Sequence, residues 1–417
     1  MTVTMLRRAR LRPHPMTVDS MLLFLKALVA AATQTVFWLV AARLHSPEVV
    51  GVAGSLISAT ISLSFFSQLG LNFSLVGLLP SSRTPASDVA TALLVVGAAG
   101  LLCGAGFALV APQVAAPLAF LGRSPVLALA FAVLVAGSAM NLLTDPVFLV
   151  LRAVPANLAV NGVLAGTLRC LLPLALAGLG AFGLFASVGL ALTVAAAVST
   201  WAILRRLPRP LRWIRAPADL RGVAGFAGAG YATSALDMVP LLVLPLLVID
   251  VRGAAASGVF FVCFQVATLL TALVLAVAMS MLAEGSRHPE RAAAVSRRAA
   301  KLLAATVTAA VVVIIASRQL VLAVFGPAYA ERGGAVLMVL ALGTFGVAVN
   351  YWALMRLRLA RQLGATVLMQ AVTCVAILGL AAVGVTAGLV WVAAAWGLGQ
   401  LAGGVVGLVA VARGASR

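Results

Sequence analysis

The chain has 417 residues, of which 63% are hydrophobic and only 9% are charged. A soluble domain contains roughly 45–50% apolar residues, so this composition excludes an ordinary soluble protein and predicts several membrane-spanning helices. The net charge is +19, from 29 Lys and Arg against 10 Asp and Glu. Because the basic residues lie at the ends of apolar segments, as in membrane proteins generally, no nucleic-acid partner is expected.

The amino terminus carries four arginines ahead of a long apolar run from Val18 to Leu44. A signal-peptide core is about 7–15 residues long, so this run predicts an uncleaved first helix, with cleavage near Ala30 as the alternative. Eleven further apolar runs follow. The first six expected spans are Val18–Leu44, Val49–Leu79, Val89–Val110, Pro125–Leu151, Asn157–Leu179 and Phe182–Leu204. The second six are Val223–Ile249, Ala255–Leu282, Ala299–Val324, Ala335–Leu357, Gly364–Val385 and Gly388–Val411.

A basic, proline-containing stretch at Arg205–Arg221 separates the two sets of six. The sequence therefore predicts an all-α polytopic membrane protein with two six-helix lobes, residues 1–207 and 208–417, joined by a cytoplasmic linker. With both termini in the cytoplasm, roughly 22 Lys and Arg fall on the inner side and about 4 on the outer side, as expected for a cell-membrane protein.

The two halves resemble each other weakly. A Gly-Val pair opens the second span of each half, at Gly51 and Gly258. Glycines at helix-packing spacing, Gly100/Gly104 and Gly399/Gly403/Gly407, predict close contacts between helices of one chain. They leave the oligomeric state open.

No set of residues predicts catalysis. The histidines lie outside the apolar spans, the external acids are scattered, and the four cysteines lie singly within apolar runs. Neither a nucleophile with its base nor a metal or cofactor site is indicated. These patterns favour transport over an enzyme.

Five ionisable residues lie within the spans, where a charge is costly and is a functional candidate by default: Lys26, Asp145, Arg169, Asp237 and Arg318. Lys26 either extends to the cytoplasmic interface or faces a cavity. Asp145 precedes Pro146, so its carboxylate either has a structural role near a kink, reaching interfacial water or Arg152, or serves a cavity.

Arg169 and Asp237 are both expected near the middle of the membrane, where each needs a partner or water. A structural Arg169–Asp237 ion pair is one interpretation. Two prolines follow Asp237 and predict a break in its helix, as found at transporter binding sites. Arg318 lies near the outer end and is expected to reach the interface.

Three stretches carry a resemblance to a known family. They are Ala42–Glu48 with Gly51, Phe66–Leu71 with Leu79-Pro80, and Val324–Ala330. They resemble polysaccharide flippases of the O-antigen type, in the multidrug/oligosaccharidyl-lipid/polysaccharide (MOP) superfamily. The resemblance implies a cavity between two lobes, lined by the first, second, seventh and eighth helices, that moves a polyprenyl-diphosphate-linked oligosaccharide for surface polysaccharide such as lipopolysaccharide.

On this reading Lys26 and Arg169 bind the substrate, and Asp237 and Asp145 couple transport to H+ or Na+. Two alternatives stay open. A cation-coupled multidrug antiporter of the same fold would use Asp237 as its coupling carboxylate. A membrane glycosyltransferase or ligase would need an essential external acid or histidine instead.

Overall fold

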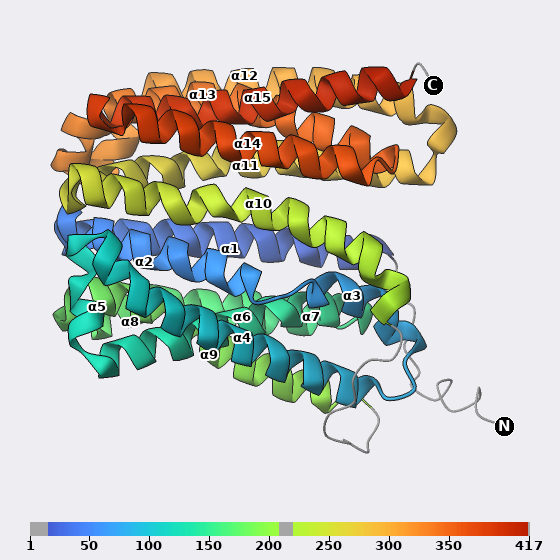
Figure 1. Cartoon of the computed structure of the whole chain (residues 1–417), viewed down its shortest axis with the longest axis horizontal. Helices are drawn as coiled ribbons and strands as arrows, with labels where there is room; N and C mark the ends of the chain where they lie inside the picture. The colour runs from blue at the N-terminus through green and yellow to red at the C-terminus, as the bar shows by residue number, and fades with distance from the viewer. Residues whose placement is uncertain (1–15, 208–219, 416–417) are drawn as a thin grey trace.

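A computed structural model describes residues 16–207 and 220–415, and all regular elements in these ranges are helical (Figure 1). The first set comprises α1 (Met16–Leu44), α2 (Pro47–Phe66), α3 (Leu71–Leu78), η2 (Leu79–Ser81), α4 (Pro85–Val114), η3 (Ala116–Leu118), α5 (Ala119–Arg123), α6 (Pro125–Val150), α7 (Val154–Asn157), η4 (Leu158–Leu164), α8 (Ala165–Ala175), η5 (Ala177–Leu179) and α9 (Gly180–Leu204). The second set comprises α10 (Leu220–Arg252), α11 (Ala254–Arg287), η6 (Pro289–Arg291), α12 (Ala292–Phe325), α13 (Pro327–Leu359), α14 (Leu363–Gly384), η7 (Val385–Ala387) and α15 (Leu389–Ala415).

The twelve predicted spans are confirmed. Twelve helices in the described ranges are long and apolar enough to cross a membrane. They form two lobes of six, and successive connections alternate between the two ends of the bundle (Figure 1). The connection at 208–219, which contains most of the basic linker, and both chain ends lie outside the described residues, so the linker and the orientation of the termini stay predictions.

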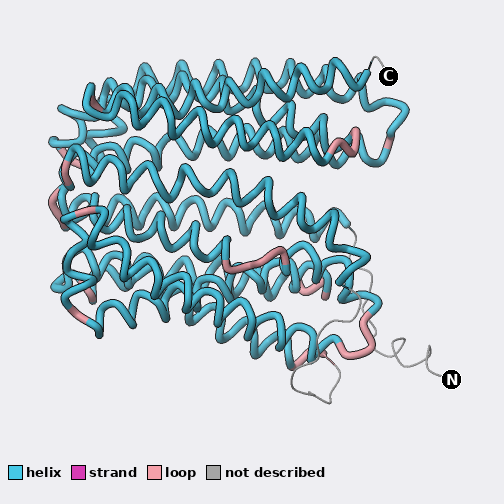
Figure 2. Tube along the Cα trace, in the orientation of Figure 1, coloured by secondary structure: helices cyan, strands magenta, loops and turns pink. Residues whose placement is uncertain are grey.

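The second predicted span is not one continuous helix. It breaks after Phe66, and the pink loop inside the bundle in Figure 2 marks the break between α2 and α3. Leu69 and Gly70 take positive φ angles of 49° and 79°, which end the helical hydrogen-bond ladder. Gln68 is fully buried there, and its Nε2 donates to the Ala139 carbonyl of α6 at 2.8 Å. The break is thus anchored to the first lobe.

The expected break in the seventh span is wrong. α10 runs from Leu220 to Arg252 as one helix, with Pro240 and Pro245 inside it. Membrane helices tolerate proline where neighbouring helices and hydroxyl side chains satisfy nearby backbone groups. Here α2, α11 and α14 pack along α10, and the Ser62 hydroxyl donates to the Met238 carbonyl at 3.1 Å.

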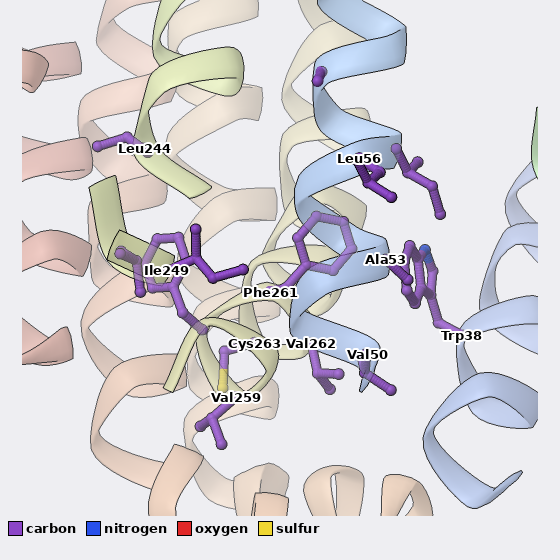
Figure 3. Packing of buried hydrophobic residues seen from close by; sticks show 14 of the residues in the cluster. Trp38, Val50, Ala53, Leu56, Leu244, Ile249, Val259, Phe261, Val262 and Cys263 are labelled. Carbon is purple, nitrogen blue, oxygen red and sulfur yellow. The ribbon is translucent and has the colours of Figure 1, made fainter. Parts of the chain in front are cut away.

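The two lobes meet where α2 packs against α10 and α11. Figure 3 shows this core, with Phe261 of α11 between the apolar side chains of α2 and those of α10. At the crossing of α2 and α11, a Cβ on Gly51 would meet the Ala254 carbonyl, and one on Gly258 would meet the Pro47 carbonyl. The two glycines noted as equivalent positions in the two halves therefore pack directly on each other.

Further contacts join the lobes at both ends of this interface. The Arg43 Nε at the end of α1 donates to the Val324 carbonyl at the end of α12, at 2.8 Å. Nearer the opposite end, the Tyr231 hydroxyl of α10 donates at 2.7 Å to the Phe66 carbonyl, at the break between α2 and α3. The glycine stripes pack within single lobes, as predicted: Gly100 against Ala136 of α6, and Gly403 against Thr373 of α14.

Candidate functional site

Lys26 and Asp145 form an ion pair inside the first lobe. The Lys26 Nζ on α1 lies 2.6 Å from the Asp145 Oδ1 on α6, and the two side chains are 18% and 39% exposed. Lys26 therefore points inward and does not extend to the cytoplasmic interface. Asp145 pairs with Lys26, and no ion pair between Asp145 and Arg152 occurs among the described residues.

An amide from the fifth span also contacts Asp145. The Asn161 Nδ2 donates to the Asp145 Oδ1 at 2.7 Å, and the Asn161 Oδ1 accepts from Asn141 at 2.9 Å and from Ser199 at 3.1 Å. Asn161 lies in η4, a π-helical segment between α7 and α8. Because π-helical turns are rare and common at functional sites, this local geometry and the ion pair together indicate a functional region.

A cavity of about 150 Å³ adjoins this network. Its wall comes from α2, α6 and α9 and contains Asp145 together with Asn141, Thr60 and Ser64. A carboxylate with neutral amide and hydroxyl neighbours suits a small cation or water. Within the described residues, Lys26 is the cation that occupies this carboxylate.

Asp237 lies in the corresponding part of the second lobe. Its carboxylate accepts from the Tyr351 hydroxyl of α13 at 3.4 Å and from the Gln370 Nε2 of α14 at 3.3 Å. It lines a second cavity of about 150 Å³ with side chains of α11, α13 and α15, including Thr268 and Gln400. No ion pair of Asp237 occurs among the described residues.

The two networks occupy equivalent places in the two lobes. Each joins a charged group on the first helix of its lobe to the fourth helix and to an amide on the fifth. Asn161 and Gln370 both lie seven residues after the first residue of their spans, Val154 and Leu363. Neither amide was predicted from the sequence, because the expected spans begin at Asn157 and Gly364 and do not give the two residues a common offset.

The proposed Arg169–Asp237 ion pair does not form. Arg169 on α8 donates instead through Nη1 to the Gln34 Oε1 on α1, at 2.7 Å. Gln34 in turn donates through Nε2 to the Gln265 Oε1 of α11, at 3.3 Å. Arg169 thus belongs to a polar chain that crosses from the first lobe to the second, and Asp237 belongs to the interior of the second lobe.

Arg318, the fifth candidate, has a local role. Its Nη1 donates to the Ile315 carbonyl of its own helix at 2.7 Å. The four cysteines are free, as expected for packing residues. Among the described residues, no group of three or more His, Cys, Asp or Glu side chains could hold a metal ion.

No protein-family model matches the chain, and no curated protein matches it significantly. Solved structures match over nearly the whole chain. The lipid II flippase MurJ in an inward closed conformation superposes with a TM-score of 0.74 at 10% identity, covering 95% of this chain and 87% of that one.

Two solved structures of multidrug resistance MATE-family transporters of the MOP superfamily, in different conformations, are also similar. An inward-facing one gives a TM-score of 0.68 at 16% identity, covering 92% of this chain and 95% of that one. An outward-facing one gives 0.63 at 15% identity, with 95% of each chain covered. The fold is that of MOP-superfamily transporters. At these identities the likeness establishes the fold alone and leaves the substrate open.

Proposed function

We propose that the chain is an alternating-access transporter that flips a polyprenyl-diphosphate-linked oligosaccharide across the cell membrane for surface polysaccharide. The charged residues that lie within the spans of the first lobe support this proposal, because cations outnumber acids among them. In the described part of that lobe, away from the helix ends, two cations, Lys26 and Arg169, accompany one acid, Asp145. An excess of positive charge within the spans of this lobe suits an anionic substrate.

The substrate's chemistry makes such cations necessary. A lipid diphosphate keeps its negative charges while it crosses, and removing an ion from water costs several kcal/mol unless opposite charges or donors replace the water. An ammonium suits a phosphate as a mobile point charge. Lys26 would capture the head group by exchanging Asp145 for a phosphate, and Asp145 would then be free to take H+ or Na+.

Asp237 would be the main coupling group of the second lobe. Its carboxylate lines a cavity, has neutral hydrogen-bond donors and has no ion-pair partner among the described residues. The same observation favours the second candidate function, a cation-coupled multidrug antiporter. Asp237→Asn should make transport independent of the ion gradient in both cases, so the transported compound distinguishes them.

Complementation in cells tests the capture role of Lys26. In a strain without its own flippase, Lys26→Gln should lose most surface polysaccharide, and Lys26→Arg should retain part of it. Lys301→Gln is a matched control, because Lys301 is an exposed cation on α12 and should support normal export. Normal surface polysaccharide from Lys26→Gln at the wild-type protein level would contradict the role.

A further inference from the structure

A polar chain crosses the lobe interface at the depth of Arg169. Arg169 on α8, Gln34 on α1 and Gln265 on α11 are linked by hydrogen bonds of 2.7 and 3.3 Å. Arg169 lies 15 residues into the fifth span, which begins at Val154, and at a rise of 1.5 Å per residue this is about 22 Å from the start of the span. All three side chains are half-buried. The cluster therefore lies inside the membrane-spanning bundle, about two thirds of the way along the fifth span, and is shared by both lobes.

Several hydrogen-bond donors in this cluster have no partner among the described residues. Gln34 uses both its oxygen and its nitrogen within the chain of bonds, and Gln265 uses its side-chain oxygen. Arg169 donates from Nη1, while its buried Nε has no partner. A guanidinium has five N–H donors, so most of those on Arg169 are unused. The Gln265 Nε2 likewise donates to no described residue.

Among the described residues, no acid forms an ion pair with Arg169. The three ion pairs of the described residues involve other groups: Lys26 with Asp145, and His288 and Arg291 with Glu290. An uncompensated charge within a membrane is costly and marks a functional site. Arginine presents its donors in a planar fork that matches phosphate oxygens. A cation with neighbouring N–H donors that have no partner is suited to an oxyanion.

We propose that Arg169, Gln34 and Gln265 form a second binding site for the phosphate groups of the transported lipid. This site is shared between the two lobes, and the lipid reaches it after Lys26. This inference rests on the proposed function and specifies the route of the head group. Lys26 and Gln34 are eight residues apart on α1, about 12 Å along the helix. The head group would move along α1 from the ammonium of Lys26 to the guanidinium of Arg169.

Because the site is shared between the two lobes, its affinity for phosphate depends on how close the lobes are. Arg169 and Gln34 belong to the first lobe, and Gln265 belongs to the second. When the lobes separate at this depth, Gln265 moves away from Arg169 and the site loses one of its donors. The phosphate is held most tightly while the lobes are together, and it is released as they part.

Binding measurements on the full-length protein in lipid nanodiscs test this site. The probes are farnesyl diphosphate, farnesol as its neutral counterpart, and inorganic pyrophosphate, with Kd measured by calorimetry. Wild type should bind farnesyl diphosphate and not farnesol. Pyrophosphate binding as tight as that of farnesyl diphosphate would instead indicate a site for free phosphates and would overturn the lipid assignment.

The variants separate Arg169 from Lys26. Arg169→Gln should weaken farnesyl diphosphate binding at least tenfold, about 1.4 kcal/mol, and Arg169→Lys should recover part of the loss. Gln265→Leu should weaken binding roughly threefold, and Gln265→Glu more, because it places a negative charge against the phosphates. Arg318→Gln is the matched control, an arginine bonded to its own helix that should bind as wild type does.

Two outcomes would overturn the inference. One contradicts only the second phosphate site, and the other also contradicts the proposed function. If Arg169→Gln binds farnesyl diphosphate with a Kd within twofold of wild type while Lys26→Gln binds it more weakly, the second binding site is wrong and the proposed function is unaffected. If wild type binds no diphosphate at all, both the second phosphate site and the proposed function are contradicted. Should Arg169→Gln fail to fold, the two Gln265 variants decide: unchanged affinity in both contradicts a site shared between the lobes.

Discussion

At the scale of single residues, the Lys26–Asp145 ion pair is a structural contact and, under the proposed function, would compete with the substrate for Lys26. The ammonium lies 2.6 Å from the carboxylate, and both side chains are only partly exposed. A phosphate that binds Lys26 must replace this carboxylate. If the proposed function holds, the affinity of the protein for a lipid diphosphate would reflect the difference between two interactions of the same cation.

Asp145→Asn should tighten farnesyl diphosphate binding about three- to tenfold, because the competing carboxylate is removed and Lys26 stays. The free energy of unfolding should fall by about 1–2 kcal/mol, less than for a fully buried pair, because both side chains retain some exposure. Calorimetry of the variant in nanodiscs measures the affinity. The double variant Lys26→Gln/Asp145→Asn is the control and should bind weakly. Weaker binding by Asp145→Asn alone would show that Asp145 assists the substrate.

The individual charged residues could be found from sequence, but their partners could not. Lys26, Asp145, Arg169 and Asp237 are conspicuous because charge is rare in apolar spans. Their pairing depends on how helices distant in sequence face one another. The expected Arg169–Asp237 pair failed for this reason, since equal depth in the membrane does not bring two helices together.

At the scale of elements, the crossing of α2 and α11 holds the lobes together near the connections that follow α1 and α10. Gly51 and Gly258 permit backbone contact there, and added methyl groups would meet carbonyl oxygens of the opposite helix. Such a contact cannot relax by a change of side-chain rotamer. A larger residue must separate the two helices.

Gly51→Ala should shift the protein toward a form that is open at this crossing. A single cysteine at Val259, which is 1% exposed on α11, reports the change: labelling by an impermeant thiol reagent should rise several-fold in the Gly51→Ala background. Gly106→Ala on α4 is the control, because a Cβ there meets nothing within 4 Å. Equal labelling in the two backgrounds would contradict a gating role for this crossing.

Helix positions were predictable to within a few residues for most spans, because apolar length marks a span directly. The break after Phe66 was not, since the apolar run continues through it and only the backbone angles of Leu69 and Gly70 reveal it. The continuity of α10 was missed for the opposite reason. Proline signals a possible break, and the neighbouring helices determine whether one occurs.

At the scale of the whole molecule, twelve spans with connections that alternate between the two ends of the bundle agree with the predicted number of helices, and the end that faces the cytoplasm stays a prediction from charge. Single cysteines at Ser46, Gly253 and Glu331, on or beside three connections at one end of the bundle, should label from outside the cell. A cysteine at the exposed Ser286, near the opposite end of α11, should label only after the membrane is permeabilised. External labelling at Ser286 would reverse the orientation.

We propose that the first lobe carries a lipid diphosphate past Lys26 and Arg169. The most direct test of this route is transport in proteoliposomes that contain a fluorescent sugar linked to a short polyprenyl diphosphate, with quenching from outside reporting arrival in the outer leaflet. Wild type should move this lipid and not its neutral polyprenol analogue, and Lys26→Gln and Arg169→Gln should each slow the movement at least tenfold. Export of an organic cation by wild-type protein that leaves the diphosphate lipid unmoved would contradict the account and favour the multidrug antiporter.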